Sequence, residues 1–219
     1  MKITGRQSSD LLRAMFQDVP IIPVLVIHDV SDAIPVAQAL VLGGLPVVEV
    51  TLRTPAAIEA IKAMSTVAGC VVGVGTLLSN DDVTTAIGAG AKFGVSPGTT
   101  DKLLASCEKH GLPLLGGVTT VSEIMLLHER GYNVAKFFPA EASGGASALK
   151  AFAGPMPGFH FCPTGGLNPG NVETYLKLPN VLCAGGSWIV PPEHLKVGNW
   201  SDIENLARQA SKLPRCTAG

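Results

Sequence analysis

The chain has 219 residues, of which 47% are hydrophobic and 15% charged, and its formal net charge is -1. This length suits one α/β domain with a large core, and the low share of charge favours a sheet that is buried on both faces. The charge balance excludes the basic surface that binds nucleic acid or an anionic membrane. An acidic small-molecule substrate therefore needs positive charge placed locally, and the low share of charge also favours an oligomer.

Short apolar runs alternate with longer amphipathic segments along the whole chain. The apolar runs predict strands at 21–27, 46–52, 70–76, 92–96, 112–118, 134–139, 160–164 and 181–184. The segments between and after them predict helices that begin near Ser31, Pro55, Asn80, Thr100, Val121, Ala146, Asn168 and Ser201. Eight strand-then-helix units in this length predict a closed parallel barrel, the (β/α)8 or TIM barrel of the α/β class.

Two of these helices carry sequence signals for their first turn. Thr54 places a capping hydroxyl before Pro55 at the first helical position, and the segment from Thr120 to Glu123 has the form of a capping box. An extra N-terminal helix near residues 9–16 precedes the first strand, and we expect it to cap the barrel floor. The tail after Leu213 is expected to be frayed.

An open, doubly wound sheet would use the same alternation of strands and helices. That fold favours Gly-x-Gly-x-x-Gly after its first strand, whereas the first strand here ends in Val26-Ile27-His28-Asp29. The barrel is therefore the preferred architecture. Because no linker or low-complexity segment divides the chain, residues 1–219 are predicted to form a single domain.

The cysteines and the first residues bear on the compartment. The five cysteines form an odd set without a CxxC pair or a Cys/His cluster of metal-ligand spacing, so we expect reduced, buried thiols and no bound metal. Residues 1–10 lack the apolar core of a signal peptide, and no stretch has the ~20 apolar residues of a membrane span. The sequence predicts a soluble cytoplasmic protein without membrane or nucleic-acid partners.

A single basic residue, Lys136, interrupts the sixth predicted strand, which is otherwise apolar. A lysine is almost never fully buried unless it is paired or used. Inside a barrel, burial disfavours the charged ammonium, and a neutral amine is a nucleophile that forms a Schiff base with a ketone. The alternative is a lysine whose ammonium reaches water from the edge of a strand.

In a (β/α)8 barrel the active site lies at the C-terminal ends of the strands. Side chains alternate along a strand, so Glu49, Thr51 and Arg53 share one face, as do Lys136 and Phe138. A carboxylate in the lumen can carry protons for a lysine-bound intermediate, or it can simply neutralise a buried cation. Other polar or glycine-rich strand ends are at 73–76, 96–98, 116–119, 163–166 and 185–187.

Two glycine pairs, Gly165-Gly166 and Gly185-Gly186, lie near the ends of the last two strands and are followed by Ser187 in the second case. Barrels of this type usually bind phosphate at that place, through backbone N–H groups and helix N-termini. Glycine lets a phosphate approach the backbone closely. The same residues also suit tight strand-to-helix turns, and both interpretations stay open.

Six segments together resemble class I 2-keto-3-deoxy-6-phosphogluconate (KDPG) aldolases of the KDPG/KHG aldolase family. They occur in order over nearly the whole chain, at 48–53, 73–76, 95–98, 136–141, 162–166 and 185–188. Gly116 stands where many relatives have proline, and Ser143 stands where asparagine is common. These departures concern the substrate wall and a loop and leave the Schiff-base residues unchanged.

The resemblance implies a lyase that needs no cofactor and cleaves KDPG, a phosphorylated keto acid, to pyruvate and glyceraldehyde 3-phosphate in the Entner-Doudoroff pathway. It also implies a homotrimer. Lys136 would form the Schiff base, and Glu49 would accept and donate protons. The other implied sites are Arg53, Thr76 and Thr164 for the substrate carboxylate, Pro97 and Phe138 for the apolar wall, and Gly165, Gly166, Gly186 and Ser187 for the phosphate.

Other functions remain compatible with these residues. The closest is an aldolase for another 2-keto acid, such as 4-hydroxy-2-oxoglutarate (KHG) or 2-keto-3-deoxy-6-phosphogalactonate. A phosphosugar isomerase or epimerase would use Glu49 as the base and Lys136 as an electrostatic helper, with no covalent adduct. A non-catalytic protein that binds phosphate ligands leaves the joint presence of Glu49 and Lys136 unexplained.

Overall fold

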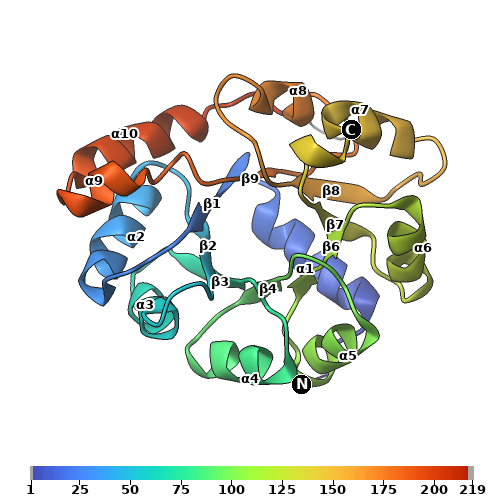
Figure 1. The fold of residues 1–219 in the computed structure, drawn as a ribbon, viewed down its shortest axis with the longest axis horizontal. Coiled ribbons are helices and arrows are strands. Elements are labelled where there is room, and N and C mark those ends of the chain that lie inside the picture. The colour runs from blue at the N-terminus through green and yellow to red at the C-terminus, as the bar shows by residue number, and fades with distance from the viewer. Residues whose placement is uncertain (1, 217–219) are drawn as a thin grey trace.

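The computed structural model describes residues 2–216 and forms a curled parallel sheet inside a ring of helices (Figure 1). The chain returns outward to a helix after most strands, as the alternation of apolar and amphipathic segments predicts. The strands are β1 (Ile21–Leu25), β2 (Val47–Thr51), β3 (Val71–Gly75), β4 (Phe93–Val95), β5 (Leu114–Leu115), β6 (Gly117–Val118), β7 (Val134–Phe137), β8 (His160–Pro163) and β9 (Ala184–Gly186).

The sheet closes through two ladders of parallel strands. One ladder has the order β5-β4-β3-β2-β1-β9 and the other the order β6-β7-β8. On one side β5 and β6 follow each other along the chain, and on the other side the bridges Phe161–Val181 and Thr164–Gly185 join β8 to the segment that contains β9. The predicted closed barrel is therefore confirmed.

The fifth predicted strand, 112–118, is interrupted at Gly116. Ser96 N donates to Leu115 O at 3.3 Å and Lys136 N donates to Gly116 O at 2.9 Å, so the chain changes its partner from β4 to β7 at this residue. A Cβ at position 116 would lie 2.3 Å from Thr99 Cγ2. The last strand also starts later than predicted, since Val181 makes only an isolated bridge.

The helices lie around the outside of the sheet, except α1, which crosses one end of the barrel (Figure 1). They are α1 (Gly5–Phe16), α2 (Ala33–Leu42), α3 (Ala57–Met64), α4 (Asn80–Gly88), α5 (Asp101–His110), α6 (Val121–Glu129), α7 (Gly145–Phe152), α8 (Val172–Leu176), α9 (Pro192–Lys196) and α10 (Trp200–Ala210), with the 3-10 turns η1 (Val30–Asp32) and η2 (Glu141–Ser143). Helix α9 was not predicted, and α8 begins after the predicted Asn168, because Asn168 and Asn171 form a hydrogen-bonded turn there. No helix within residues 2–216 has both the length and the apolar character needed to cross a bilayer.

Of the two predicted helix caps, one is present in the structure and the other is not. The capping box at the start of α6 is confirmed, because Thr120 Oγ1 accepts from Glu123 N and the Glu123 carboxylate accepts from Thr120 N at 2.8 Å. The predicted cap at Thr54 is wrong, since α3 begins at Ala57. The Thr54 hydroxyl instead donates to Ile27 O at 2.5 Å, which ties the loop after β2 to the loop after β1.

Helix α1 covers the floor of the barrel, as predicted, although it begins at Gly5 rather than near residue 9. Two buried serines on α1 satisfy backbone groups at the start of two strands: Ser8 Oγ accepts from Leu114 N at 2.9 Å and Ser9 Oγ accepts from Asn133 N at 3.0 Å. The helix therefore serves as a hydrogen-bonded plug as well as an apolar cover.

The tail after Leu213 is ordered up to residue 216, so the expectation of fraying is wrong for these residues. Cys216 N donates to Leu176 O at 2.9 Å, and the Arg215 guanidinium donates to Leu182 O at 3.3 Å and to Gln17 O at 2.5 Å. These bonds hold the tail against the barrel floor. Residues 217–219 lie outside the described part of the chain.

Candidate active site

Lys136 and Glu49 meet inside the barrel, from strands β7 and β2. Lys136 Nζ lies 3.5 Å from Glu49 Oε1, and the two side chains are 7% and 5% exposed. Lys136 pairs in register with Gly117 on one side and Cys162 on the other, so it stands within the sheet rather than at its edge. This burial excludes the alternative in which the ammonium reaches water.

Glycine in β3 makes room for the Glu49 carboxylate. Glu49 is opposite Gly73 in the β2–β3 register. Its carboxylate, however, lies against Gly75, two residues further along β3. A Cβ at position 75 would lie 2.2 Å from Glu49 Oε1 and 2.8 Å from Glu49 Cδ. Since Gly75 is the last residue of β3, this position brings the carboxylate toward the C-terminal ends of the strands, where barrel active sites lie.

An aromatic ring flanks the amine. Lys136 Nζ lies 5.1 Å from the centre of the Phe138 ring, within the range of a cation–π contact. Phe137 faces the other way and packs edge-on against Phe152 of α7, with ring centres 6.0 Å apart. The alternation predicted for this strand is therefore confirmed, and Phe138 supplies an apolar neighbour for the amine.

A cavity of about 150 Å³ opens at the C-terminal end of the barrel. It brings together six of the predicted site residues, namely Arg53, Phe138, Thr164, Gly165, Gly166 and Ser187. Val24, Leu167 and Gly185 complete its lining and were not predicted as lining residues. Gly185 has to be small, because a Cβ there would lie 2.3 Å from Thr164 Oγ1.

The turn after β8 contributes Gly165 and Gly166 to the lining of this cavity. Gly165 and Gly166 have φ angles of 101° and 81°, in the left-handed region that favours glycine. Their carbonyls are used, since Gly165 O accepts from Glu141 N and Gly166 O accepts from Asn171 Nδ2, both at 3.1 Å. Within residues 2–216, the amides of Gly165 and Gly166 have no acceptor, which leaves them available to an anion.

Five predicted site residues are not among the lining residues of this cavity: the buried pair of Lys136 and Glu49, and Gly186, Pro97 and Thr76. Gly186 lies in β9 beneath the Trp188 ring, which a Cβ at position 186 would meet at 2.3 Å, whereas the next residue, Ser187, is exposed and does line the cavity. Pro97 is exposed, and its carbonyl packs against Gly117. Thr76 is half-buried with φ 63°, the sole non-glycine residue with a positive φ in the described part of the chain. Such strain occurs most often at functional sites.

A second, wider cavity of about 600 Å³ adjoins the first and shares Val24 and Ser187 with it. His28, Asp29 and Lys196 are among its lining residues. His28, which follows the first strand, lies in this neighbouring cavity. Helix α9 lines this cavity with Pro192 and Lys196. The sequence did not predict this helix, because the residue before it, Pro191, is not a capping residue.

All five cysteines are free thiols, as expected, but they differ in burial. Cys107, Cys162 and Cys183 are buried, Cys70 is half-buried and Cys216 is exposed, so the expectation of uniformly buried thiols is wrong. Burial raises the pKa of Cys70 to about 11 and, helped by the Glu108 charge, that of Cys107 to about 12. These two thiols therefore stay protonated at neutral pH.

Comparison with known proteins agrees with this geometry. The model of the KDPG and KHG aldolase family matches residues 12–206. The 2-dehydro-3-deoxy-phosphogluconate aldolase of Pseudoalteromonas atlantica is 49% identical over 197 residues, which are 90% of this chain and 92% of that protein. The KHG/KDPG aldolase of Escherichia coli K12 is 47% identical over 192 residues, which are 87% of this chain and 90% of that protein.

The solved structures agree as well. A KDPG aldolase from Legionella pneumophila, with pyruvate captured at low pH as a covalent carbinolamine intermediate, has a TM-score of 0.88 and 48% identity to this chain, and the match covers 91% of this chain and 98% of that one. The family match includes the strands that carry Lys136 and Glu49. The chain therefore belongs to the KDPG and KHG aldolase family.

Proposed function

We propose that this protein is a class I aldolase that cleaves KDPG to pyruvate and glyceraldehyde 3-phosphate, a reaction of the Entner-Doudoroff pathway, through a Schiff base on Lys136. The observation that carries the proposal is the buried pair of Lys136 and Glu49, with 3.5 Å between Nζ and Oε1. The relatives named as aldolases of this substrate and the carbinolamine in the Legionella structure support the same chemistry.

The first half of the reaction joins the amine to the substrate. Glu49 takes a proton from the Lys136 ammonium, and the neutral amine attacks the C2 ketone to form a carbinolamine. The carbinolamine oxygen receives a proton from Glu49 and leaves as water, which yields a protonated imine. The 3.5 Å between Lys136 Nζ and Glu49 Oε1 places the two groups close enough for these proton transfers.

The second half breaks the carbon–carbon bond. Glu49 accepts the proton of the C4 hydroxyl, the C3–C4 bond breaks, and its electron pair moves into the imine to give an enamine and glyceraldehyde 3-phosphate. Glu49 then protonates the enamine at C3, and water hydrolyses the imine to release pyruvate and the amine. Phe138, 5.1 Å from Nζ, stabilises the cationic imine with its ring face and keeps water away.

The two ends of the substrate carry negative charge, and we assign them to two sides of the mouth. Arg53 pairs with the C1 carboxylate, since a guanidinium binds a carboxylate through two hydrogen bonds, and the hydroxyls of Thr76 and Thr164 complete that pocket. Four residues of extended chain span about 13 Å, so Arg53 folds back over the mouth to reach this group. Its place in the cavity lining with Thr164 supports this assignment.

The phosphate end is assigned to the turn after β8 and to the start of the segment after β9. The unpartnered amides of Gly165 and Gly166 and the exposed hydroxyl of Ser187 support this assignment, with Gly186 placing Ser187. Phe138 is assigned to the apolar wall, and Pro97, which is exposed and outside the cavity lining, is assigned to its outer rim.

We also propose that the protein acts as a homotrimer of single-domain subunits, each spanning 1–219, in the cytoplasm. Exposed leucines at positions 42, 78 and 126, each at least 64% exposed, supply apolar surface for subunit contacts. The free cysteines suit a reducing compartment. Light scattering of the purified protein measures the assembly, and a mass other than three chains would contradict the trimer.

A second substrate is supported by the name of the Escherichia coli relative, which includes KHG. Pyruvate release from KDPG, its galactonate epimer, unphosphorylated 2-keto-3-deoxygluconate and KHG tests both proposals. We expect KDPG to be cleaved fastest and Lys136→Met to abolish all cleavage, with Lys150→Met on the exposed face of α7 as the matched control. Equal rates with and without the phosphate would contradict the phosphate site, and rearrangement without pyruvate would identify an isomerase or epimerase.

A further inference from the structure

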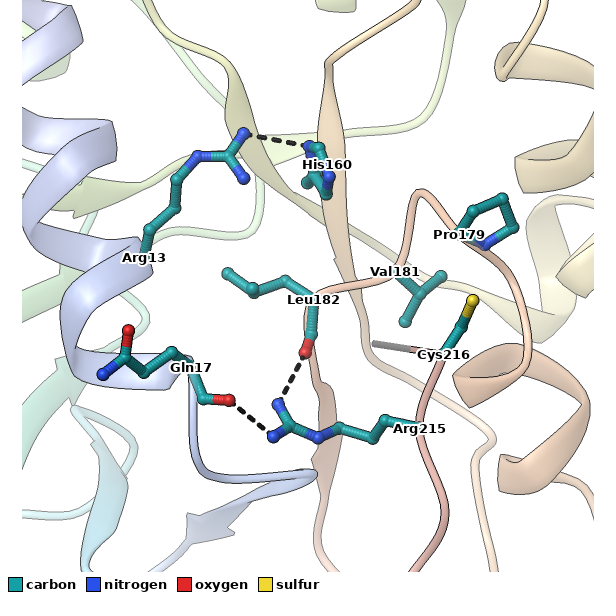
Figure 2. A pocket seen from close by; sticks show the side chains of 8 residues that line it. All are labelled: Arg13, Gln17, His160, Pro179, Val181, Leu182, Arg215 and Cys216. Carbon is teal, nitrogen blue, oxygen red and sulfur yellow. Dashed lines mark hydrogen bonds between the residues drawn. The ribbon is translucent and has the colours of Figure 1, made fainter. Parts of the chain in front are cut away.

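Another cavity lies at the opposite end of the barrel, at the N-terminal ends of the last strands. Its volume is about 230 Å³, and its lining includes Arg13 of α1, His160 at the start of β8, and Arg215 and Cys216 of the C-terminal tail. Figure 2 shows the two arginines extending from opposite sides of the cavity, one from the helix and one from the tail. This cavity has no part in the proposed aldolase reaction.

Both guanidinium groups are held by neutral acceptors. Arg13 Nη2 donates to Asn133 O at 3.2 Å. It also donates to His160 Nδ1 at 2.9 Å, and Arg215 Nη1 donates to Leu182 O at 3.3 Å (Figure 2). Within residues 2–216, Arg13 Nη1 and Arg215 Nε have no hydrogen-bond acceptor. Each arginine is therefore fixed in position and still has a donor to offer.

No carboxylate lines the cavity among the described residues. The acid whose charge acts on Arg13 is Asp10, which is exposed and already paired with Arg6 at 3.3 Å. Burial lowers the pKa of Arg13, which shows that its guanidinium is partly shielded from water. Among residues 2–216, the cavity therefore holds two fixed positive charges and no carboxylate to neutralise them.

His160 is a further polar residue in the lining of this cavity. An arginine can only donate, so His160 Nδ1 accepts from Arg13 and the ring proton resides on Nε2. The 3.1 Å approach of Nδ1 to Gly158 O is then a close contact and not a hydrogen bond. Burial lowers the pKa of His160, and the Arg13 charge lowers it further, which favours this neutral ring at neutral pH.

We infer that this floor cavity binds a small dianion that carries a phosphate group, held between Arg13 and Arg215. The planar guanidinium fork matches the oxygens of phosphate, and two cations favour a dianion over a monocarboxylate. The volume is below the about 300–1,000 Å³ of sites for drug-sized ligands, so inorganic phosphate or a short phosphorylated metabolite fits, whereas a nucleotide does not.

The inferred site is separate from the phosphate site proposed at the mouth. Residues 160 to 164 of one extended segment lead from the floor cavity to Thr164, a distance of about 13 Å. A local probe is therefore needed to tell the two sites apart. Cys216 supplies it, because it lines the floor cavity and is exposed, whereas the other four cysteines are buried or half-buried.

The test is alkylation of Cys216 by the neutral reagent iodoacetamide, followed by mass spectrometry of its peptide. We expect inorganic phosphate to slow the modification at least fivefold at saturation, while sodium chloride of equal ionic strength leaves the rate unchanged. Glycerol 3-phosphate in a parallel arm distinguishes the sources, since protection at lower concentration by the ester assigns the site to a phosphorylated metabolite. Absence of protection by both anions in the wild type would overturn the inference.

Substitutions of the two arginines test whether the phosphate that protects Cys216 binds in the floor cavity. Arg215→Gln and Arg13→Gln are each expected to raise the half-protecting phosphate concentration at least tenfold, whereas Arg208→Gln, an exposed arginine of α10, leaves it unchanged. Aldol cleavage and circular dichroism should be normal in Arg215→Gln, which keeps the test valid if Arg13→Gln fails to fold. Equal protection of wild type and Arg215→Gln would overturn the inference.

Discussion

Replacing Gly75 by alanine tests how strictly the barrel must place the Glu49 carboxylate. The added Cβ would lie 2.2 Å from Glu49 Oε1, whereas ordinary contacts begin at 3.4 Å, so the oxygen must retreat by about 1.2 Å. The clash is with the end of a flexible side chain, and Gly75 has no positive φ, so the strand itself accommodates alanine. A displacement of about 1 Å at a reacting group can cost about 100-fold in rate.

The assay is pyruvate release from KDPG by purified Gly75→Ala. We expect kcat to fall by about 100-fold while KM changes little, because the substrate's charged ends bind elsewhere. Gly98→Ala is the matched control, since a Cβ at that strand end meets no atom within 4 Å. Its turnover should equal that of the wild type.

Turnover of Gly75→Ala within threefold of the wild type, with the carboxylate displaced in its crystal structure, would contradict this prediction. Glu49 would then not carry the protons of the reaction. Loss of turnover with an undisturbed carboxylate would equally contradict the argument, because the effect would come from somewhere else.

Three further predictions concern single residues. Glu49→Gln should lower kcat at least ~100-fold with an unchanged circular dichroism spectrum, and near-normal turnover would move the proton transfers to another group. Thr120→Ala should lower the free energy of unfolding by about 1 kcal/mol and Tm by about 2–4 °C in calorimetry, because it removes the cap of α6; an unchanged Tm would contradict this. Burial raises the pKa of Glu123, but hydrogen bonds from Thr119 N, Thr120 N and Thr120 Oγ1 outweigh it and lower the pKa overall. This stabilisation is complete above the unfolded value of about 4.3 and is lost as the pH falls through the lower folded value. The difference in unfolding free energy between wild type and Glu123→Gln should therefore shrink from pH 7 to about pH 3, and a constant difference would refute the assignment.

The sequence was sufficient for the barrel and for the central pair. Strand alternation alone puts Lys136 and Phe138 on one face of the strand and Phe137 on the other. The apolar residues around Lys136 in this strand imply that it is buried. The same alternation turns Glu49 inward. These predictions held because side-chain direction within a strand is a local property of the chain.

Predictions that depend on contacts between distant segments were less successful. The Thr54 cap failed because its hydroxyl finds Ile27 O, a partner on another loop. The space that Gly75 leaves for Glu49 depends on the register of β2 and β3, which no local pattern reveals. The floor cavity joins residues 13, 160 and 215, which are brought together only by closure of the barrel and return of the tail.

The most direct test of the central claim is reductive trapping. Borohydride added to the protein with pyruvate should reduce the imine to a stable secondary amine, inactivate the enzyme, and place the modification on the Lys136 peptide, with the Lys150 peptide unmodified. An unmodified Lys136 peptide, under conditions that inactivate a control class I aldolase, would contradict the Schiff-base mechanism.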